Sequence, residues 1–227
     1  DDSEKKNIQS ELPKEFLSLA YRHPSPVYKN AMMYLQKRGI TYEDILKYGI
    51  GYCDEGLYTN RIIIPSYDED GQLNFFVGRD MFESKMKYRN SPTQKDIIGF
   101  DLFINWDEPI VLCEGPFDAI AIKRNAVPIL GKSISNSLMK KLVQSKSEEI
   151  YIALDKDAQS KALQYSEQFL NMGKKVFLVK MEDKDPSEMG FVEFTKHIQT
   201  AKQLDLQAIM QYKLGIFQMW TSQSEIR

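Results

Sequence analysis

Four acidic residues of this sequence lie where they could hold metal ions together. Each follows a short stretch rich in Ile, Val and Leu that is expected to be a buried strand; they are Glu114, Asp155, Asp157 and Asp185. Ligands of parallel sheets bind at the carboxyl ends of the strands. Carboxylates gathered there repel one another unless cations neutralise them. Oxygen ligands without His or Cys favour Mg²⁺ or Mn²⁺, which can in turn hold substrate phosphates.

The same acids have a structural alternative. Asp157 precedes a helix expected at 158–172 and could cap it, while Asp118 lies in the first turn of a helix expected at 117–124 and suits its dipole. The recurrence of an acid at successive strand ends favours the metal site over isolated caps.

Other catalytic chemistries find little support in the sequence. The two cysteines, Cys53 and Cys113, stand in strand-like stretches without a neighbouring base, and no CxxC pair is present. Gly131-Lys132-Ser133 lacks the upstream Gly of a phosphate-binding loop, because residue 126 is Ala.

A basic segment at 79–95 is the candidate substrate surface. It contains Arg79, Lys85, Lys87, Arg89 and Lys95 against two acids, Asp80 and Glu83, which leaves a local charge of +3. Such a segment is often merely solvated, but it can also contact phosphates, with Tyr88 stacking on a base. Arg61, at the entrance of the preceding hairpin, is expected to share this surface.

Two kinds of architecture follow one another along the chain. Up to about residue 105, helices at 27–38 and 42–48 precede a hairpin whose turn is Asp68-Glu69-Asp70-Gly71. From 106 to 190, strands at 110–113, 127–130, 150–154 and 175–180 alternate with helices at 117–124, 136–144 and 157–172. This alternation predicts an α/β unit with a mainly parallel sheet flanked by helices. A helical tail is expected over 191–227.

The overall composition is that of a globular protein in a reducing compartment. The chain has 227 residues, 42% of them hydrophobic, and a net charge of −2. No disulfide framework, secretory signal or membrane-spanning stretch is apparent, which favours the cytoplasm. The chain begins with Asp1 rather than Met, which indicates a piece of a longer protein.

Three motifs together resemble the Toprim domain of bacterial- and phage-type DNA primases: Glu114-Gly115-Pro116-Phe117-Asp118, Asp155-Lys156-Asp157-Ala158 and Lys184-Asp185-Pro186-Ser187-Glu188. Upstream, Tyr34-Leu35-Gln36-Lys37-Arg38-Gly39-Ile40, Asn60-Arg61-Ile62 and Lys87-Tyr88-Arg89-Asn90-Ser91-Pro92 are similar to the primase amino-terminal subdomain. The resemblance covers about residues 28–190 in unbroken order. It implies a mixed α+β subdomain over 1–105, a Toprim subdomain over 106–190 and a helical tail.

The resemblance also implies roles for single residues. Glu114 would act as general acid/base or lie beside the metal, Asp155, Asp157 and Asp185 would bind Mg²⁺ or Mn²⁺, and Asp118 would support that site. The residues implied to contact the incoming nucleotide or the template are Arg61, Arg79, Lys87, Tyr88 and Asn90.

The family makes short RNA primers from ribonucleoside triphosphates on single-stranded DNA, usually with a replicative helicase, which here would be recruited through a flanking domain. A monomer without membrane contact is expected. Lys156 stands where bacterial primases typically have Gly, which favours a phage version acting in the host cytoplasm. No zinc-binding module is present in the sequence.

Three rival functions remain open at the level of sequence. One is a Toprim nuclease that cuts DNA with Mg²⁺ or Mn²⁺. Another is a catalytically idle module that holds single-stranded DNA or a helicase. A receiver-like α/β domain is a third, and the 79–92 element argues against it.

Overall fold

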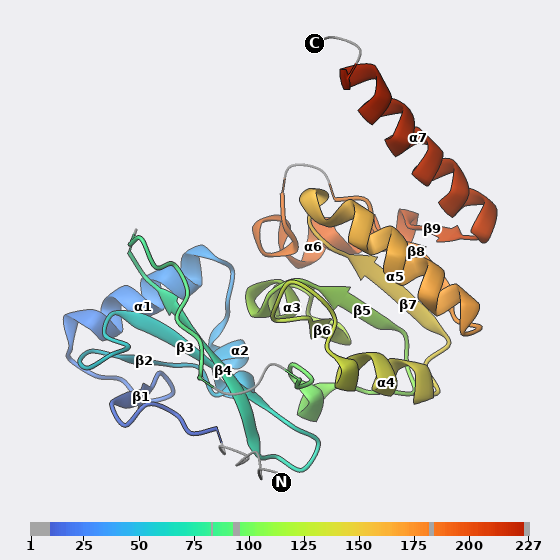
Figure 1. The fold of residues 1–227 in the computed structure, drawn as a ribbon. Helices are drawn as coiled ribbons and strands as arrows, with labels where there is room; N and C mark the ends of the chain where they lie inside the picture. The colour runs from blue at the N-terminus through green and yellow to red at the C-terminus, as the bar shows by residue number, and fades with distance from the viewer. Residues whose placement is uncertain (1–9, 83, 93–95, 182–183, 225–227) are drawn as a thin grey trace, which may run out of the picture.

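The computed structural model describes residues 10–82, 84–92, 96–181 and 184–224, with the side chains of all of these except 216–224. Glu83 and Lys95 of the basic segment, and Glu182 and Asp183 before the Lys184–Glu188 motif, lie outside the described residues. Helices and strands form two units around separate sheets (Figure 1).

The first unit is built on an antiparallel sheet of order β1-β2-β3-β4. Its strands are β1 (Phe16–Ser18), β2 (Gly51–Cys53), β3 (Arg61–Tyr67) and β4 (Leu73–Asp80), with helices α1 (Pro26–Lys37) and α2 (Tyr42–Tyr48). The expected turn joins β3 to β4, where Gly71 has a φ of +78° and donates its N–H to Asp68 O. Thr41 caps α2 reciprocally with Asp44.

The second unit has a five-stranded sheet of order β6-β5-β7-β8-β9. Its strands are β5 (Ile110–Cys113), β6 (Ala126–Pro128), β7 (Glu149–Ala153), β8 (Lys175–Leu178) and β9 (Lys202–Leu204). The first four are parallel and β9 is antiparallel to β8. The helical elements of the chain from here on are η1 (Asp101–Phe103), α3 (Pro116–Ile122), α4 (Asn136–Gln144), η2 (Lys156–Ala158), α5 (Gln159–Asn171), α6 (Pro186–Thr200) and α7 (Leu206–Ser224).

Helices cover both faces of the second sheet. Alternate residues of its strands point to opposite sides, so each strand contributes apolar side chains to both faces. Val111 and Cys113 belong to the apolar cluster that includes α3 and α6, whereas Ile110 and Leu112 belong to the cluster that includes α4 and α5. The predicted α/β unit, flanked by helices and preceded by a mixed α+β unit, is confirmed.

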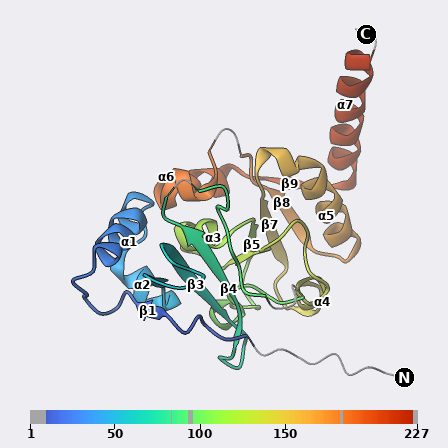
Figure 2. The ribbon, with the colours of Figure 1, turned by 60° about the vertical axis from the view of Figure 1, so that its left-hand side comes forward.

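The two units share one apolar core on the α3 side of the second sheet. Residues of α1, β2, β3 and β4 cluster with Phe117 of α3 and Phe194 of α6. Figures 1 and 2 show α3 and α6 on the side of the second sheet that faces the first unit. This shared core fixes the position of the basic segment relative to the strand ends.

The carboxyl-terminal region differs in detail from the helical tail expected after Gly190. Helix α6 already begins at Pro186, because Asp185 caps it, and Gly190 interrupts it with a φ of +74°. Strand β9 then extends the sheet before α7, which projects away from the body (Figures 1 and 2). The helical character of this region is confirmed, while unit boundaries at 105/106 and 190/191 remain a proposal. Within the described part of the chain, no helix is long and apolar enough to cross a membrane.

Candidate active site at the strand ends

Glu114 and Asp155 meet because their strands are parallel neighbours. Cys113, the last residue of β5, is in register with Ala153, the last residue of β7. The backbone N–H of Asp155 donates to Oε1 of Glu114 at 3.2 Å. Two of the predicted acids therefore lie side by side at the carboxyl edge of the sheet.

Asp118 ties this edge to the loop that follows β8. Its Oδ2 accepts the N–H of Gly115 at 3.1 Å, and its Oδ1 accepts the N–H of Ser187 at 3.2 Å. Burial, followed by repulsion from Asp185, raises the pKa of Asp118 to about 7, although the two backbone hydrogen bonds act in the opposite direction. Asp118 thus positions the neighbouring acids and is itself crowded by negative charge.

Asp155 is a second carboxyl at this edge whose ionisation is disfavoured. Burial raises its pKa to about 6, with further contributions from Glu114 and Asp185. Its Oδ1 is buried without a hydrogen-bond partner among the described residues. An unpaired carboxylate oxygen in this setting is costly unless a cation or a donor from a ligand reaches it.

Asp157 and Asp185 complete the acidic group in different ways. Asp185 caps α6, since its Oδ1 accepts the Oγ–H of Ser187 at 2.7 Å and the N–H of Glu188 at 2.8 Å. Asp157 is exposed in η2 and caps nothing; the residue at the cap position of α5 is Ala158. Both acids line a cavity of about 360 Å³ together with Asp155, Lys156 and Glu188.

The residues of this acidic cavity fit a hard divalent cation. Its acidic side chains offer oxygen ligands, one of them unpaired, and the repulsion among them would be relieved by positive charge. No group of three or more His, Cys, Asp or Glu side chains among the described residues is arranged to hold a metal by itself. Mg²⁺ is commonly held by one or two carboxylates, with water and substrate phosphates as its other ligands.

Arg61 is placed differently from a surface ligand. It is 6% exposed, and its guanidinium donates to the carbonyls of Gly78, Met86 and Lys87 and lies 3.6 Å from Asp80. These contacts hold the segment after β4 against the sheet. A direct contact between Arg61 and the nucleotide or template therefore stays a prediction. What the structure shows is that Arg61 positions the segment that carries Lys87.

Lys87 and Tyr88 belong to the exposed part of the basic segment, whereas Arg79 beside them is buried. Arg79 donates from Nε to the Tyr34 hydroxyl at 2.8 Å, and its guanidinium lies 4.8 Å from the centre of the Tyr88 ring. Lys87 is exposed, with Nζ 5.9 Å from the same ring. Burial raises the pKa of Tyr88, although the side chain keeps 43% of its surface exposed.

Several polar atoms of this segment lack partners among the described residues. They are Nη1 of Arg79, Nε of Arg89 and Oδ1 of Asn90. Buried donors and acceptors are rarely left unpaired unless water or a ligand reaches them. We call Arg79, Lys87, Tyr88, Arg89 and Asn90 the basic ridge.

Arg38, which the sequence did not predict as a site residue, lies between the basic ridge and the acids. Its guanidinium lies 5.0 Å from the centre of the Tyr34 ring, and the Tyr34 hydroxyl accepts a hydrogen bond from Arg79. The guanidinium also lies 4.9 Å from the ring centre of Phe117, which precedes Asp118 in the chain. The available signal was its place in the Tyr34–Ile40 motif. A basic residue after a helix is commonly explained by the helix dipole alone.

Comparisons with known proteins agree with this geometry. Residues 111–189 match a family model described as Toprim-like. The chain is 33% identical over 146 residues to the uncharacterized MG010 homolog of Mycoplasma pneumoniae, covering 60% of this chain and 68% of that protein. It is 32% identical over 145 residues to the uncharacterized protein MG010 of Mycoplasma genitalium, covering 59% of this chain and 65% of the relative.

A DNA primase of Thermotoga maritima is 26% identical over 175 residues, which cover 57% of this chain and 31% of the primase. Among solved structures, the catalytic domain of a DnaG primase bound to single-stranded DNA superposes with a TM-score of 0.69 at 21% identity, covering 84% of this chain and 77% of that one. The chain thus spans about two thirds of the Mycoplasma relatives and a much smaller part of the primase. These relatives are bacterial proteins, and the phage version stays a prediction.

Proposed function

Since this chain belongs to the family of the Mycoplasma MG010 proteins and carries the Toprim-containing core of bacterial-type DNA primases, we propose that it joins ribonucleotides into short primers on single-stranded DNA. The observation that carries the proposal is the meeting of Glu114, Asp118, Asp155 and Asp185 at one sheet edge, linked through Arg38 to a basic ridge.

The reaction assigns a task to each group of residues. The 3′-hydroxyl oxygen of one nucleotide attacks the α-phosphorus of the next, the bond to the bridging oxygen breaks, and pyrophosphate leaves. Glu114 takes the hydroxyl proton, while Asp118 keeps the first turn of α3 and the 185–187 loop together. Asp155, Asp157 and Asp185 would hold Mg²⁺ or Mn²⁺, which would neutralise charge on the phosphates when bound.

The basic ridge supplies the template and triphosphate side of the site. Lys87 and Tyr88 are exposed for phosphate and base contacts, and unpaired atoms of Arg79 and Asn90 offer a donor and an acceptor. Arg38, between the ridge and Phe117, is suited to a phosphate near the acids. The DNA bound to the DnaG catalytic domain is consistent with a nucleic-acid partner here.

A direct assay separates this function from its rivals. The chain is incubated with single-stranded DNA, Mg²⁺ or Mn²⁺ and labelled ribonucleoside triphosphates. We expect short RNA products that disappear with EDTA and with Glu114→Gln, and that persist with Asp70→Asn, a matched change at an exposed turn. Cut DNA without RNA would instead identify a nuclease, and binding without either product would identify an idle module. A replicative helicase partner, a monomeric state and a cytoplasmic location stay predictions.

A further inference from the structure

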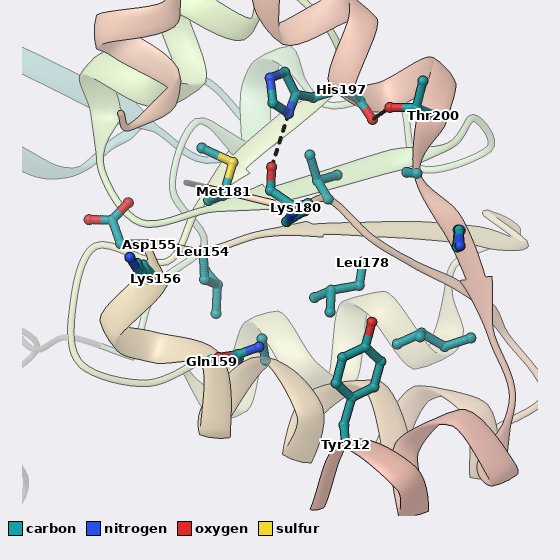
Figure 3. Close-up of a pocket in the computed structure, with 15 residues that line it drawn as sticks. Leu154, Asp155, Lys156, Gln159, Leu178, Lys180, Met181, His197, Thr200 and Tyr212 are labelled. Atoms are coloured by element: carbon teal, nitrogen blue, oxygen red, sulfur yellow. Dashed lines mark hydrogen bonds between the residues drawn. The ribbon is translucent and has the colours of Figure 1, made fainter. Parts of the chain in front are cut away.

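Cavities outside the acidic one differ in what surrounds them. One of about 630 Å³ is lined by residues of the second unit alone, between β8, β9 and α7 (Figure 3). Another, of about 480 Å³, lies between residues 30–37 of α1 and residues 81–82, which directly follow β4. We call it the α1 groove. The segment after β4 also carries Lys87 and Tyr88, so the α1 groove borders the chain segment to which the basic ridge belongs.

Two large apolar side chains of the α1 groove are exposed to solvent. Met33 of α1 keeps 67% of its surface exposed, and Phe82 keeps 54%. Single exposed apolar residues are common, but two that line one cavity from different elements indicate a binding surface. A methionine side chain packs favourably against aromatic rings, and a phenylalanine ring stacks on nucleobases. The α1 groove therefore offers two suitable contacts for a flat aromatic ring.

Hydrogen bonds at the end of β4 fix the backbone position of Phe82. Its N–H donates to Oδ1 of Asp80 at 2.8 Å, and Asp80 lies 3.6 Å from the buried guanidinium of Arg61. Met81 donates its N–H to the carbonyl of Asn60 at 3.1 Å. The exposed ring thus stands on a hydrogen-bonded backbone, which lowers the entropy that is lost when a ligand binds.

Tyr34 joins the α1 groove to the basic ridge. Its side chain lines the groove, while its hydroxyl accepts the Nε–H of Arg79 at 2.8 Å. The guanidinium of Arg79 lies 4.8 Å from the ring centre of Tyr88. Lys37 is exposed at the groove, and none of the described residues that line the groove is acidic. The path from ridge to groove therefore suits the phosphates of one nucleic-acid strand.

From this arrangement we propose that the α1 groove holds one unpaired base of the DNA template. The base stacks on Phe82 and contacts the Met33 thioether, and Lys37 contacts an adjoining phosphate. The amides of Asn30 and Gln36 line the same groove and can donate to and accept from the edge of the base. This inference rests on the template-binding part of the proposed function and extends that surface beyond the basic ridge.

Anisotropy of a short, fluorescently labelled single-stranded oligonucleotide tests the groove, in EDTA and without ribonucleotides. We expect Phe82→Ala to weaken binding about ten-fold, because one base–aromatic stack is lost. The slope of log affinity against log salt concentration should stay unchanged, because no phosphate contact is removed. Phe82→Trp should retain the wild-type affinity. Met33→Ala should weaken binding several-fold, whereas Met210→Ala, the same change at an exposed methionine of α7, should not.

A wholly abasic strand of the same length separates stacking from other causes. Wild type and Phe82→Ala should bind this strand equally, because no base is left to enter the groove. An equal loss on the abasic strand, a changed salt slope, or wild-type affinity of Phe82→Ala for the intact strand would each overturn the proposal. Thermal melts show whether each variant remains folded.

The groove and the proposed function can fail separately. If Lys87→Met lowers the salt slope while Phe82→Ala binds like the wild type, the groove fails and the ridge stands. If DNA binds with the expected dependence on Phe82 but no primers form with metal and ribonucleotides, primer synthesis fails and the groove stands. A wild type that does not bind single-stranded DNA overturns both.

Discussion

Asp118 and Asp155 are carboxyl groups that the fold keeps among other acids at an energetic cost. Each has a raised pKa, first from burial and then from neighbouring carboxylates. Strongly shifted groups of this kind concentrate at functional sites, because structures without such a task avoid buried like charges. The cost should therefore be measurable as a lower free energy of unfolding of the metal-free protein, and it should decrease when one of these acids is replaced by its amide.

Replacing Asp155 with Asn is expected to separate activity from stability. The amide removes repulsion with Glu114, so the metal-free protein should gain about 1 kcal/mol at pH 8, which is roughly 2–4 °C in Tm for a chain of this length. RNA synthesis should fall by about 100-fold or more. Differential scanning fluorimetry and the primer assay measure the two effects. Equal loss in Asp70→Asn, or full activity in Asp155→Asn, would contradict the assignment.

The pH dependence of stability provides a second test at the same scale. The folded pKa of Asp118, about 7, lies above the ordinary value of 3.8, so the folded state binds the proton more tightly. Its contribution to stability is complete below about pH 4 and is lost as the pH rises through 7. Asp155 acts in the same direction.

In EDTA, the part of the stability that these acids control should therefore decline between pH 4 and pH 8. Urea titrations at several pH values measure this, and Asp118→Asn should flatten the decline. Mg²⁺ should restore stability at the upper end, because it binds the ionised acids of the folded state. An unchanged slope in Asp118→Asn would show that the pH dependence arises elsewhere.

At the level of elements, the segment after β4 is anchored on one side by the buried Arg61 and carries the basic ridge on its other side. Arg61 bonds three carbonyls of residues 78–87, whereas Lys87 is exposed on the same segment. A single stretch of chain thus contains both a buried anchor and a solvent-facing charge. A substitution of Arg61 should therefore lower stability, whereas a substitution of Lys87 should weaken DNA binding and leave stability nearly unchanged.

Arg61→Met is expected to lower the free energy of unfolding by about 3 kcal/mol, because it leaves Asp80 and the segment carbonyls without their buried partner. Urea titration measures this loss. Lys87→Met serves as the matched control and should change stability by less than about 0.5 kcal/mol. A stable Arg61→Met variant would argue that the segment is held by other contacts.

Lys87→Met should instead weaken binding of single-stranded DNA. If Lys87 contacts one phosphate, the slope of log affinity against log salt concentration should fall by about 1 unit, with a similar loss for different sequences. Fluorescence anisotropy over a salt series measures the slope. Lys140→Met controls for net charge, and equal effects of the two changes would remove Lys87 from the template surface.

For the molecule as a whole, the core shared by the two units is the feature that brings ridge and acids together. Phe117 is 3% exposed in this core, packs edge-on against Tyr34, and precedes Asp118 in the chain. At the other end of α3, Lys123 forms an ion pair of 2.6 Å with Asp44 of α2. The units should therefore unfold together.

Phe117→Ala is expected to cost about 3–5 kcal/mol through the cavity it leaves. In the wild type, far-UV circular dichroism and tryptophan fluorescence should report the same urea midpoint, as expected of one cooperative transition. Ala121→Gly, in the same helix but without the bulky contact, is the control, with an expected loss of about 1 kcal/mol. Two separated transitions in the wild type would contradict a common core.

The sequence by itself determined the local features of this protein. The capping of α2 by Thr41, the turn before Gly71 and the acids after β5 and β7 depend on residues close together in the chain. Apolar stretches followed by acids also indicated parallel strands with carboxylates at one edge. These signals suffice because helix caps, turns and strand alternation are short-range in origin.

Tertiary structure decided which side chains are buried and which of them meet. Arg61 and Lys87 are both basic residues near one hairpin, yet the fold of residues 78–87 over Arg61 buries the former alone. Arg38 approaches Phe117, and Glu114 approaches Asp155, because packing and sheet register join segments that are distant in the chain. Burial and desolvation depend on such long-range contacts, which no local pattern of residues encodes.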